Sequence, residues 1–486
     1  MSFTIKSVRN NLFSVTFAQF ASFFLNIITF GIIARVLSVE DYGKFNYLLA
    51  IVGFTAKFID LGINPIVLRE SAKNNRFSEY IGSVFYVKSL LIILLLVFVN
   101  IFSFLVINTM TEKILLNLLI INIFFSNKYT NIRELLVIPY KICLKMEFPM
   151  ILVLIDNILL LIISIFLKES EHALLYFGLI YLGTNIPSNV ILFIVLIKKN
   201  EIKFLFNKDF FFRLLKMAFP IYGYVLLMII YTQIDTILIG IFNGDNSVAL
   251  YSTAVRLSNP FIIFASAITI TFFPIIVNKL KEKKDVAKII GSVVSLLILF
   301  SSTISLFIFF YSKDIIRIVF GENYMEASEP LQFLGISIIF LFINFFLVDL
   351  LTAFEKQKNN FIYGILINLL SLPFYFIFLP EYSYVSASII KLSVIFVGSI
   401  YLFLSVNRIV KIRIHIFKLM IWFFLNFIVF SFLQNLNLYY AIFIECIFVS
   451  ISILILRVLT YDEIMTILSM LNIEKFMNKF SFWVEK

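Results

Sequence analysis

The chain of 486 residues has little of what soluble enzymes and metalloproteins use. It contains two cysteines and two histidines, so we expect neither a disulfide framework nor a metal site. Charged residues make up 14% and hydrophobic residues 61%, whereas soluble proteins average about 25% and about 45–50%. The Gly43-Lys44 pair lacks the preceding glycine of a phosphate-binding loop, because Ser38 stands at that position. We therefore predict no ATP hydrolysis, no cofactor and no catalytic residue.

The sequence is instead dominated by about 14 long apolar stretches, most of which reach the ~17–25 residues that cross a bilayer. They predict an all-α polytopic membrane protein with about 14 transmembrane helices. The stretches cover residues 12–34, 45–68, 81–107, 114–138, 149–167, 173–197, 217–242, 247–277, 286–311, 330–353, 360–379, 383–406, 416–434 and 437–459.

The basic residues alternate with these stretches. Most of the 40 lysines and arginines lie in the two ends of the chain and in every second connection. Short basic loops stay in the cytoplasm, so we expect both termini and Lys198–Lys216 to be cytoplasmic, with Val39–Lys44 and Asn243–Asn246 periplasmic. The protein is predicted to lie in the bacterial inner membrane. The net charge of +11 is then explained by topology and by anionic membrane lipids, without a nucleic-acid partner.

An internal repeat suggests two halves of the same orientation. Such parallel repeats form two lobes in many transporters, with the substrate path between them. We predict an N-lobe at 1–197, a cytoplasmic linker at 198–216, a C-lobe at 217–406, and two further helices with a tail at 407–486. The matching positions are Asn26, Gly31, Tyr42 and Pro65, which have the same spacing as Asp235, Gly240, Tyr251 and Pro274.

The first connection carries a motif. Gly31–Phe45 reads GIIARVLSVEDYGKF, and Phe58–Glu70 reads FIDLGINPIVLRE. Both stretches resemble the opening of the polysaccharide-exporter and O-antigen flippase families, within the multidrug/oligosaccharidyl-lipid/polysaccharide superfamily. The resemblance implies two pseudosymmetric six-helix bundles around a central cavity, with two C-terminal helices added.

The resemblance also implies a substrate and partners. The substrate would be an undecaprenyl-pyrophosphate-linked oligosaccharide, moved from the cytoplasmic to the periplasmic leaflet for O-antigen or capsule assembly. H⁺ or Na⁺ as a coupling ion, and a polysaccharide polymerase or chain-length regulator as a protein partner, are further expectations.

Charged groups inside the apolar stretches are the candidate site residues. Intramembrane charges are costly and mark substrate or ion pathways, and a pyrophosphate needs cationic groups in place of its hydration. The substrate-binding candidates are Lys57, Arg133, Arg256, Lys391, Asn26 and Asn259; the coupling or gating candidates are Asp60, Glu134, Asp235 and Asp349.

Each candidate has a plainer interpretation. Lys57 and Asp60 could form a local pair that only fixes packing, and Arg133 could extend to the membrane interface. Asp235 and Arg256 could form a static salt bridge. Lys88 and Lys128 are weaker candidates, because a long lysine can extend to the interface.

Two alternative functions stay open. A multidrug or cation antiporter of the same fold would need an acidic cavity, whereas here lysines and arginines offset the acids. A membrane glycosyltransferase or polymerase generally needs a large external loop, and the longest outward connection, Tyr311–Pro330, is short. A lipid II flippase belongs to the flippase class, but the opening motif favours the polysaccharide branch.

Overall fold

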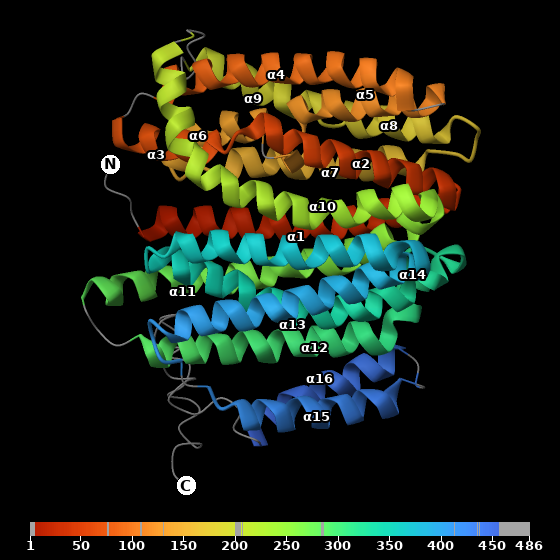
Figure 1. Ribbon diagram of the computed structural model, residues 1–486, viewed down its shortest axis with the longest axis vertical. Coiled ribbons are helices and arrows are strands. Elements are labelled where there is room, and N and C mark those ends of the chain that lie inside the picture. The colour runs from red at the N-terminus through yellow and green to blue at the C-terminus, as the bar shows by residue number, and fades with distance from the viewer. Residues whose placement is uncertain are drawn as a thin grey trace. The chain divides into compact units, whose positions relative to one another are not determined.

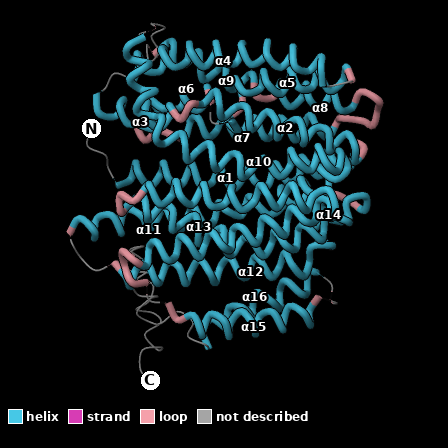
Figure 2. Tube along the Cα trace, viewed as in Figure 1, coloured by secondary structure: helices cyan, strands magenta, loops and turns pink. Residues whose placement is uncertain are grey.

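The computed structural model describes residues 5–74, 77–106, 109–129, 131–199, 206, 208–282, 286–412, 414–434, 436 and 438–455. Every regular element in these ranges is a helix, and the connections are short (Figure 2). The elements in chain order are α1 (Ile5–Val36), α2 (Val39–Asp60), α3 (Ile63–Asn74), α4 (Phe77–Val106), α5 (Met110–Phe125), η1 (Asn127–Tyr129), α6 (Ile132–Ile142), α7 (Glu147–Ile165), α8 (Ala173–Gly183), α9 (Ile186–Lys198), α10 (Lys208–Ser258), η2 (Asn259–Phe261), α11 (Ile262–Lys281), α12 (Ala287–Val319), η3 (Glu322–Ala327), α13 (Ser328–Ala353), α14 (Gln357–Asn407), α15 (Ile416–Leu433) and α16 (Leu438–Ile455).

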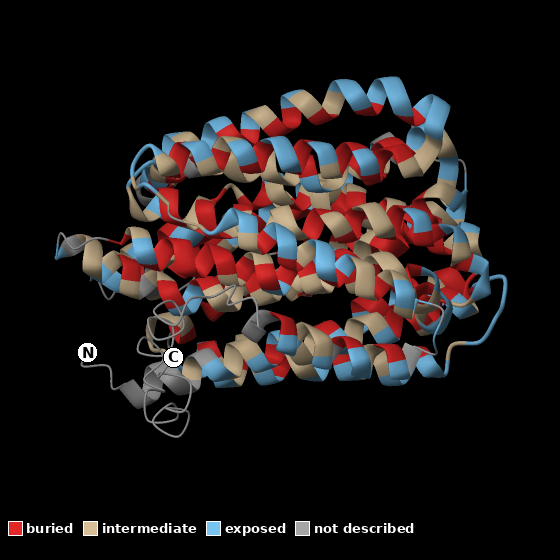
Figure 3. Ribbon diagram, turned by 90° about the horizontal axis from the view of Figure 1, so that it is seen from below, coloured by how far each residue is buried: buried red, intermediate tan, exposed pale blue. Residues whose placement is uncertain are grey.

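The length and the apolar surface of these helices suit a lipid bilayer. Ten stretches of the described residues are long and apolar enough to cross a membrane. Large hydrophobic side chains are also exposed, such as Phe13 at 70% and Phe417 at 76%, which a soluble protein would bury. Figure 3 shows exposed and buried residues on different sides of the same helices. The prediction of an all-α, multi-pass membrane protein is confirmed.

Two very long helices each cover two of the predicted segments. α10 is interrupted at Gly244 (φ 78°, ψ 179°), a conformation that glycine adopts without steric cost. α14 is interrupted at Ser383 (φ 56°, ψ −159°). α10 already begins at Lys208, so the second part of the segment predicted to be a linker is helical.

Capping side chains mark the start of two helices, α2 and α5. Ser38 caps α2 by accepting a hydrogen bond from the Asp41 backbone N–H at 3.1 Å, and Thr109 caps α5 through the Glu112 N–H at 3.4 Å. Side-chain caps satisfy N–H groups that a helix start leaves without an intrahelical partner. α2 therefore begins at Val39, within the segment predicted as an outward loop.

The helices group into two compact units by their contacts. The first unit comprises Met1–Thr253, Val319–Tyr324 and Tyr375–Tyr384, and the second comprises Ala254–Ile318, Met325–Phe374 and Val385–Lys486. In the first unit α1 packs on α7, and α4, α5, α8 and α9 lie side by side (Figure 1). The predicted domain boundaries stay predictions.

In the second unit, the last two helices pack on α12. Trp422 of α15 is fully buried against Leu299 of α12, and Phe430 joins Leu306 and Tyr311. Tyr311 lies at a kink of α12 (φ −106°, ψ 18°), and its hydroxyl donates to the Glu445 carboxylate of α16 at 2.7 Å. α15 and α16 are therefore attached by both apolar and polar contacts.

A short 3₁₀ helix that contains a proline separates α10 from α11. α10 ends at Ser258, and Pro260 lies in the short 3₁₀ helix that separates it from α11, as a proline without a backbone N–H favours. Position 274, also a proline in the sequence, lies within the continuous α11.

Candidate functional site

Three breaks interrupt helices inside the first unit. α2 gives way to α3 at Leu61-Gly62, where both residues have positive φ (53° and 63°). α5 gives way to α6 over Ser126–Asn131, and α8 to α9 at Thr184-Asn185. Broken helices leave backbone groups without partners, and within a membrane such backbone is tolerated only where protein or water satisfies it. In transporters, such breaks are where substrates and ions bind.

The first break is held by a fully buried ion pair. Lys88 of α4 is 0% exposed, and its Nζ donates to Asp60 Oδ1 at 2.7 Å and to Asn64 Oδ1 at 2.8 Å. Lys57, three residues away, was one possible partner of Asp60, but the ion pair that the structure shows for Asp60 is with Lys88. Lys88 therefore does not extend to the membrane interface, contrary to the weaker interpretation of that lysine.

Asparagines connect the first break to the second. Asn64 Nδ2 donates to the backbone oxygen of Asn131 at 3.0 Å, and Asn131 Nδ2 donates to the backbone oxygen of Ala56 at 3.2 Å. Asn64 and Asn131 are both buried. The side chains thus replace intrahelical bonds that both helices lose, and the breaks of α2–α3 and α5–α6 support each other.

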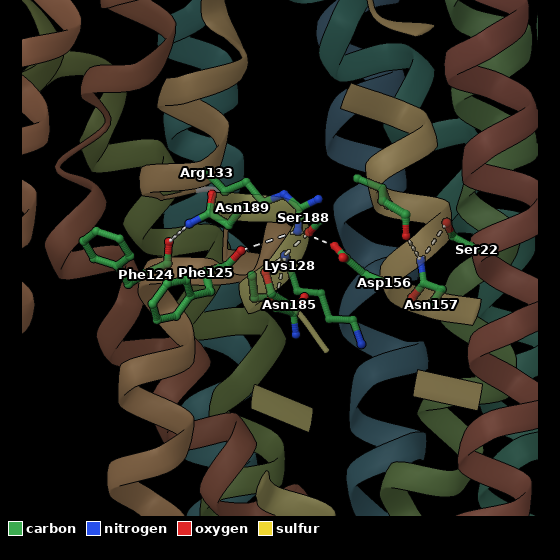
Figure 4. Close-up of polar contacts among 12 residues, drawn as sticks. Ser22, Phe124, Phe125, Lys128, Arg133, Asp156, Asn157, Asn185, Ser188 and Asn189 are labelled. Atoms are coloured by element: carbon green, nitrogen blue, oxygen red, sulfur yellow. Dashed lines mark hydrogen bonds and ion pairs between the residues drawn. The ribbon is translucent and has the colours of Figure 1, made fainter. Parts of the chain in front are cut away.

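A second buried ion pair lies at the start of α6. Arg133 is 1% exposed, and its Nη1 donates to the Asp156 carboxylate of α7 and, at 3.5 Å, to the backbone oxygen of Phe125. Figure 4 shows this pair with Ser188 beside it, at the same level as the third break. The interpretation in which Arg133 extends to the interface is wrong. A pairing that neutralises Arg133 also leaves less of its charge for a substrate.

Asp156 was missed by sequence reasoning. It stands next to Asn157 in the middle of an otherwise apolar stretch, Glu147–Ile165. An intramembrane carboxylate is a functional candidate by default, so that rule would have found it. Its arginine partner lies 23 residues away, which helix periodicity cannot reveal.

A polar network surrounds Lys128 of η1. Lys128 Nζ donates to Asn26 Oδ1 at 3.0 Å and lies 4.7 Å from the ring centre of Tyr181. Asn26 donates in turn to Asn157 Oδ1 at 3.1 Å, and Asn157 donates to Ser22 Oγ at 3.0 Å. Lys128 is exposed, unlike Lys88 and Arg133. Asn26 was a predicted binding residue, and the structure places it beside a lysine that the sequence ranked low.

Asp235 of α10 lies in a set of hydroxyl groups. It is fully buried, and it accepts hydrogen bonds from the Tyr251 hydroxyl at 2.6 Å and from the Thr236 backbone N–H at 2.7 Å. Tyr375, also fully buried, belongs to the same unit. Arg256 belongs to the second unit, so its pairing with Asp235 stays a prediction.

Six further predicted site residues are distributed over both units. Lys57 is half-buried on α2, where its backbone oxygen accepts from the Tyr222 hydroxyl at 3.1 Å. Glu134 pairs with Lys141 of its own helix at 2.8 Å. The remaining four lie in the second unit: half-buried Arg256 on α10, exposed Asn259 on η2, half-buried Asp349 on α13 and buried Lys391 on α14.

The side chains of this site offer amide groups, hydroxyl groups and pairs of opposite charges. Among the described residues no group of three or more His, Cys, Asp or Glu side chains could hold a metal ion. A network of this kind can replace the hydration of a polar head group inside a membrane.

Two family models and one known protein match the sequence of this chain. A family model described as "Polysaccharide biosynthesis protein" matches residues 8–279, and a second one, MatE, matches residues 220–377. The chain is 25% identical over 372 residues to the capsular polysaccharide biosynthesis protein CapF of Staphylococcus aureus, covering 74% of this chain and 89% of that protein.

Solved structures of the same fold are transporters. The lipid II flippase MurJ in an inward closed conformation superposes with a TM-score of 0.75 at 17% identity, covering 92% of this chain and 99% of MurJ. An inward-facing multidrug resistance transporter of the MATE family gives a TM-score of 0.61 at 14% identity, covering 80% and 95%. At these identities the likeness shows the fold alone.

Proposed function

Since the chain belongs to the polysaccharide biosynthesis protein family, whose model matches more than half of it, we propose that it is a flippase for a lipid-linked oligosaccharide. The substrate would be an undecaprenyl-pyrophosphate-linked repeat unit that moves from the cytoplasmic to the periplasmic leaflet. The name of the capsular relative supports a surface polysaccharide as the final product. The matching families consist of transporters, not enzymes.

The observation that carries this proposal is the set of charged side chains at the α2–α3 and α5–α6 breaks. A pyrophosphate cannot enter hydrocarbon without groups that replace its water. Lys88 with Asp60, and Arg133 with Asp156, form neutral buried pairs. Lys128 adds a positive charge, is exposed, and is held by Asn26. An accessible cation backed by amides and hydroxyls favours an anionic, hydroxyl-rich substrate.

The same observation weighs against a multidrug antiporter. A cationic drug needs an accessible carboxylate, but in the first unit Asp60 and Asp156 are paired with cations and Asp235 accepts bonds from hydroxyl and N–H donors. The MatE match and the MATE structures reflect the common fold. The likeness to MurJ likewise supports the fold and not lipid II as the substrate.

The proposal includes the orientation of the protein in the membrane and the coupling of transport to an ion. The basic connections favour a bacterial inner-membrane location with both termini in the cytoplasm. Asp235, a fully buried carboxylate within a predicted transmembrane stretch, is our candidate for the group that binds H⁺ or Na⁺ during the cycle. A polymerase or chain-length regulator would receive the flipped product.

Substitution of Lys128 tests the proposal. The protein is reconstituted in liposomes with a fluorescent undecaprenyl-pyrophosphate oligosaccharide, and flipping is followed as quenching by a membrane-impermeant reagent. Hydrogen bonds to charged groups are worth about 1.5–3 kcal/mol, so Lys128→Gln should slow flipping by roughly ten- to a hundredfold.

Lys145→Gln is the matched control, because Lys145 is an exposed lysine in the turn between α6 and α7. It should flip at the wild-type rate. An inactive wild-type protein would overturn the flippase proposal, and a fully active Lys128→Gln protein would remove Lys128 from the binding site.

A further inference from the structure

The last helix places a carboxyl group against an apolar cluster. α15 and α16 lie beside α12 (Figure 1), where Tyr311 of α12 packs with Phe430 of α15 and Ala441 of α16. Glu445, the one charged residue of α16, is 3% exposed. Ala441 and Val449 stand four residues before and after it, and both contact this cluster. Residues four apart share a helix face, so Glu445 faces the cluster.

The carboxyl group of Glu445 has a single hydrogen bond. The Tyr311 hydroxyl donates to its Oε1 at 2.7 Å, and among the residues that the structure describes no other group bonds to Glu445 and no lysine or arginine pairs with it. The charged residues of the neighbouring helices do not change this. α15 carries Lys418 alone, in its first turn. On α12, Lys313 is exposed, and half-buried Asp314 adds a negative charge.

The three other carboxylates that are buried in the described part of the chain have stronger support. Asp60 and Asp156 each meet a lysine or an arginine, and Asp235 accepts from a hydroxyl and from a backbone N–H. Glu445 is buried like these, without a cation and without a backbone donor. A carboxylate that loses its water in this way is costly, and one hydrogen bond does not offset the cost, so such a group is neutralised instead.

We propose that Glu445 is a proton-binding site of the folded protein, with Tyr311 as its positioning residue. At neutral pH the carboxyl group keeps its proton on Oε2, while Oε1 accepts the hydrogen bond of Tyr311. Tyr311 lies at the kink of α12 (φ −106°, ψ 18°), and from there its hydroxyl reaches α16. The ligand of this site is H⁺, and the site is separate from the predicted coupling residues, none of which lies in α12, α15 or α16.

Proton uptake is then linked to folding. In an unfolded chain a glutamate has a pKa of about 4.3 and is ionised at neutral pH. Folding therefore binds one proton at Glu445, and the folded state loses stability as the pH rises above that value. One proton corresponds to a change of about tenfold in the unfolding equilibrium constant for each pH unit. The packing of α16 on α12 is thus favoured by acid.

Infrared spectroscopy of the reconstituted full chain tests whether the proton is there. At neutral pH the spectrum should contain a carboxylic acid C=O band that Glu445→Gln removes. Tyr311→Phe should shift this band to higher frequency, because the C=O group loses its hydrogen bond. A merely structural role of Tyr311 would not move the band. Glu381→Gln is the matched control, since Glu381 is exposed and can keep its charge in water.

Equilibrium unfolding in detergent tests the linkage. Between about pH 5 and about pH 7, the unfolding equilibrium constant of the wild type, divided by that of Glu445→Gln, should rise about tenfold per pH unit. Glutamine is neutral at every pH and still accepts from Tyr311, so the ratio cancels the titration of all other groups. Glu381→Gln should give the same pH dependence as the wild type.

Two results would overturn the proton site. One is a carboxylic acid band that Glu445→Gln leaves unchanged, and the other is a ratio of unfolding constants that does not vary with pH. If Glu445→Gln does not fold, the Tyr311→Phe spectrum decides, and an unshifted band contradicts the proposal. Neither measurement uses a lipid-linked oligosaccharide, so the outcome is independent of the proposed function.

Discussion

The buried charged residues of the first unit mainly stabilise its structure, and contact with the substrate falls to other residues. Lys88 and Arg133 are each at most 1% exposed and each meets a carboxylate from another helix. Desolvation of such charges is costly, and removal of one partner leaves the other uncompensated. The accessible lysine of this region, Lys128, is exposed and touches a neutral amide. The two roles, support and substrate contact, thus fall on different residues.

Lys88→Met tests the supporting role. It leaves Asp60 buried without its cation, so the free energy of unfolding should fall by about 3–5 kcal/mol. The double variant Asp60→Asn/Lys88→Met removes both charges and should recover much of that loss. Thermal unfolding in detergent measures both, with exposed Lys145→Met as control. A double variant no more stable than Lys88→Met would show that the pair is not the cause.

Sequence reasoning found the charged residues but not their partners. Asp60 and Arg133 were both identified, because intramembrane charges stand out in an apolar background. Helix periodicity places Lys57 on the same face as Asp60 and so offered it as a possible partner, whereas Lys88 is 28 residues away. Helix periodicity relates neighbours on one helix only, so partners on other helices need the three-dimensional structure.

At the scale of helices, the apolar stretches predicted where the chain crosses the membrane but not where helices break. The α5–α6 break contains neither glycine nor proline among its described residues, Ser126–Tyr129 and Asn131. It exists because distant groups satisfy the freed backbone: Asn64 bonds the oxygen of Asn131, and Asn189 Nδ2 donates to the oxygen of Phe124 at 3.4 Å. Local helix propensity depends on neighbouring residues and cannot reveal hydrogen-bond partners that are distant in the sequence.

The attachment of α15 and α16 is also testable at this scale. Tyr311→Phe removes the hydroxyl that donates to Glu445, a carboxylate that is 3% exposed. An unsatisfied buried acceptor costs about 1–3 kcal/mol, so protease should cleave the 407–415 connection faster. Glu445→Leu added to Tyr311→Phe should restore resistance. If Tyr311→Phe alone resists protease like the wild type, the hydrogen bond does not hold these helices.

For the whole molecule, the charge distribution of the connections predicts an orientation. Fusions of alkaline phosphatase and of a fluorescent protein after Lys199 should give fluorescence without phosphatase activity, because that basic connection should stay inside. Fusions at Asn243 should give the reverse result. Phosphatase activity from the Lys199 fusion would show that the predicted orientation is inverted.

The Lys88–Asp60 pair has a consequence for the order of synthesis. Asp60 ends α2, whereas Lys88 lies in α4, so the ribosome delivers the carboxylate before its cation exists. Until α4 arrives, α2 carries an uncompensated acid that a bilayer disfavours. We therefore expect α2 to be stable in lipid only once α4 has joined it, so that these helices assemble before the chain is complete.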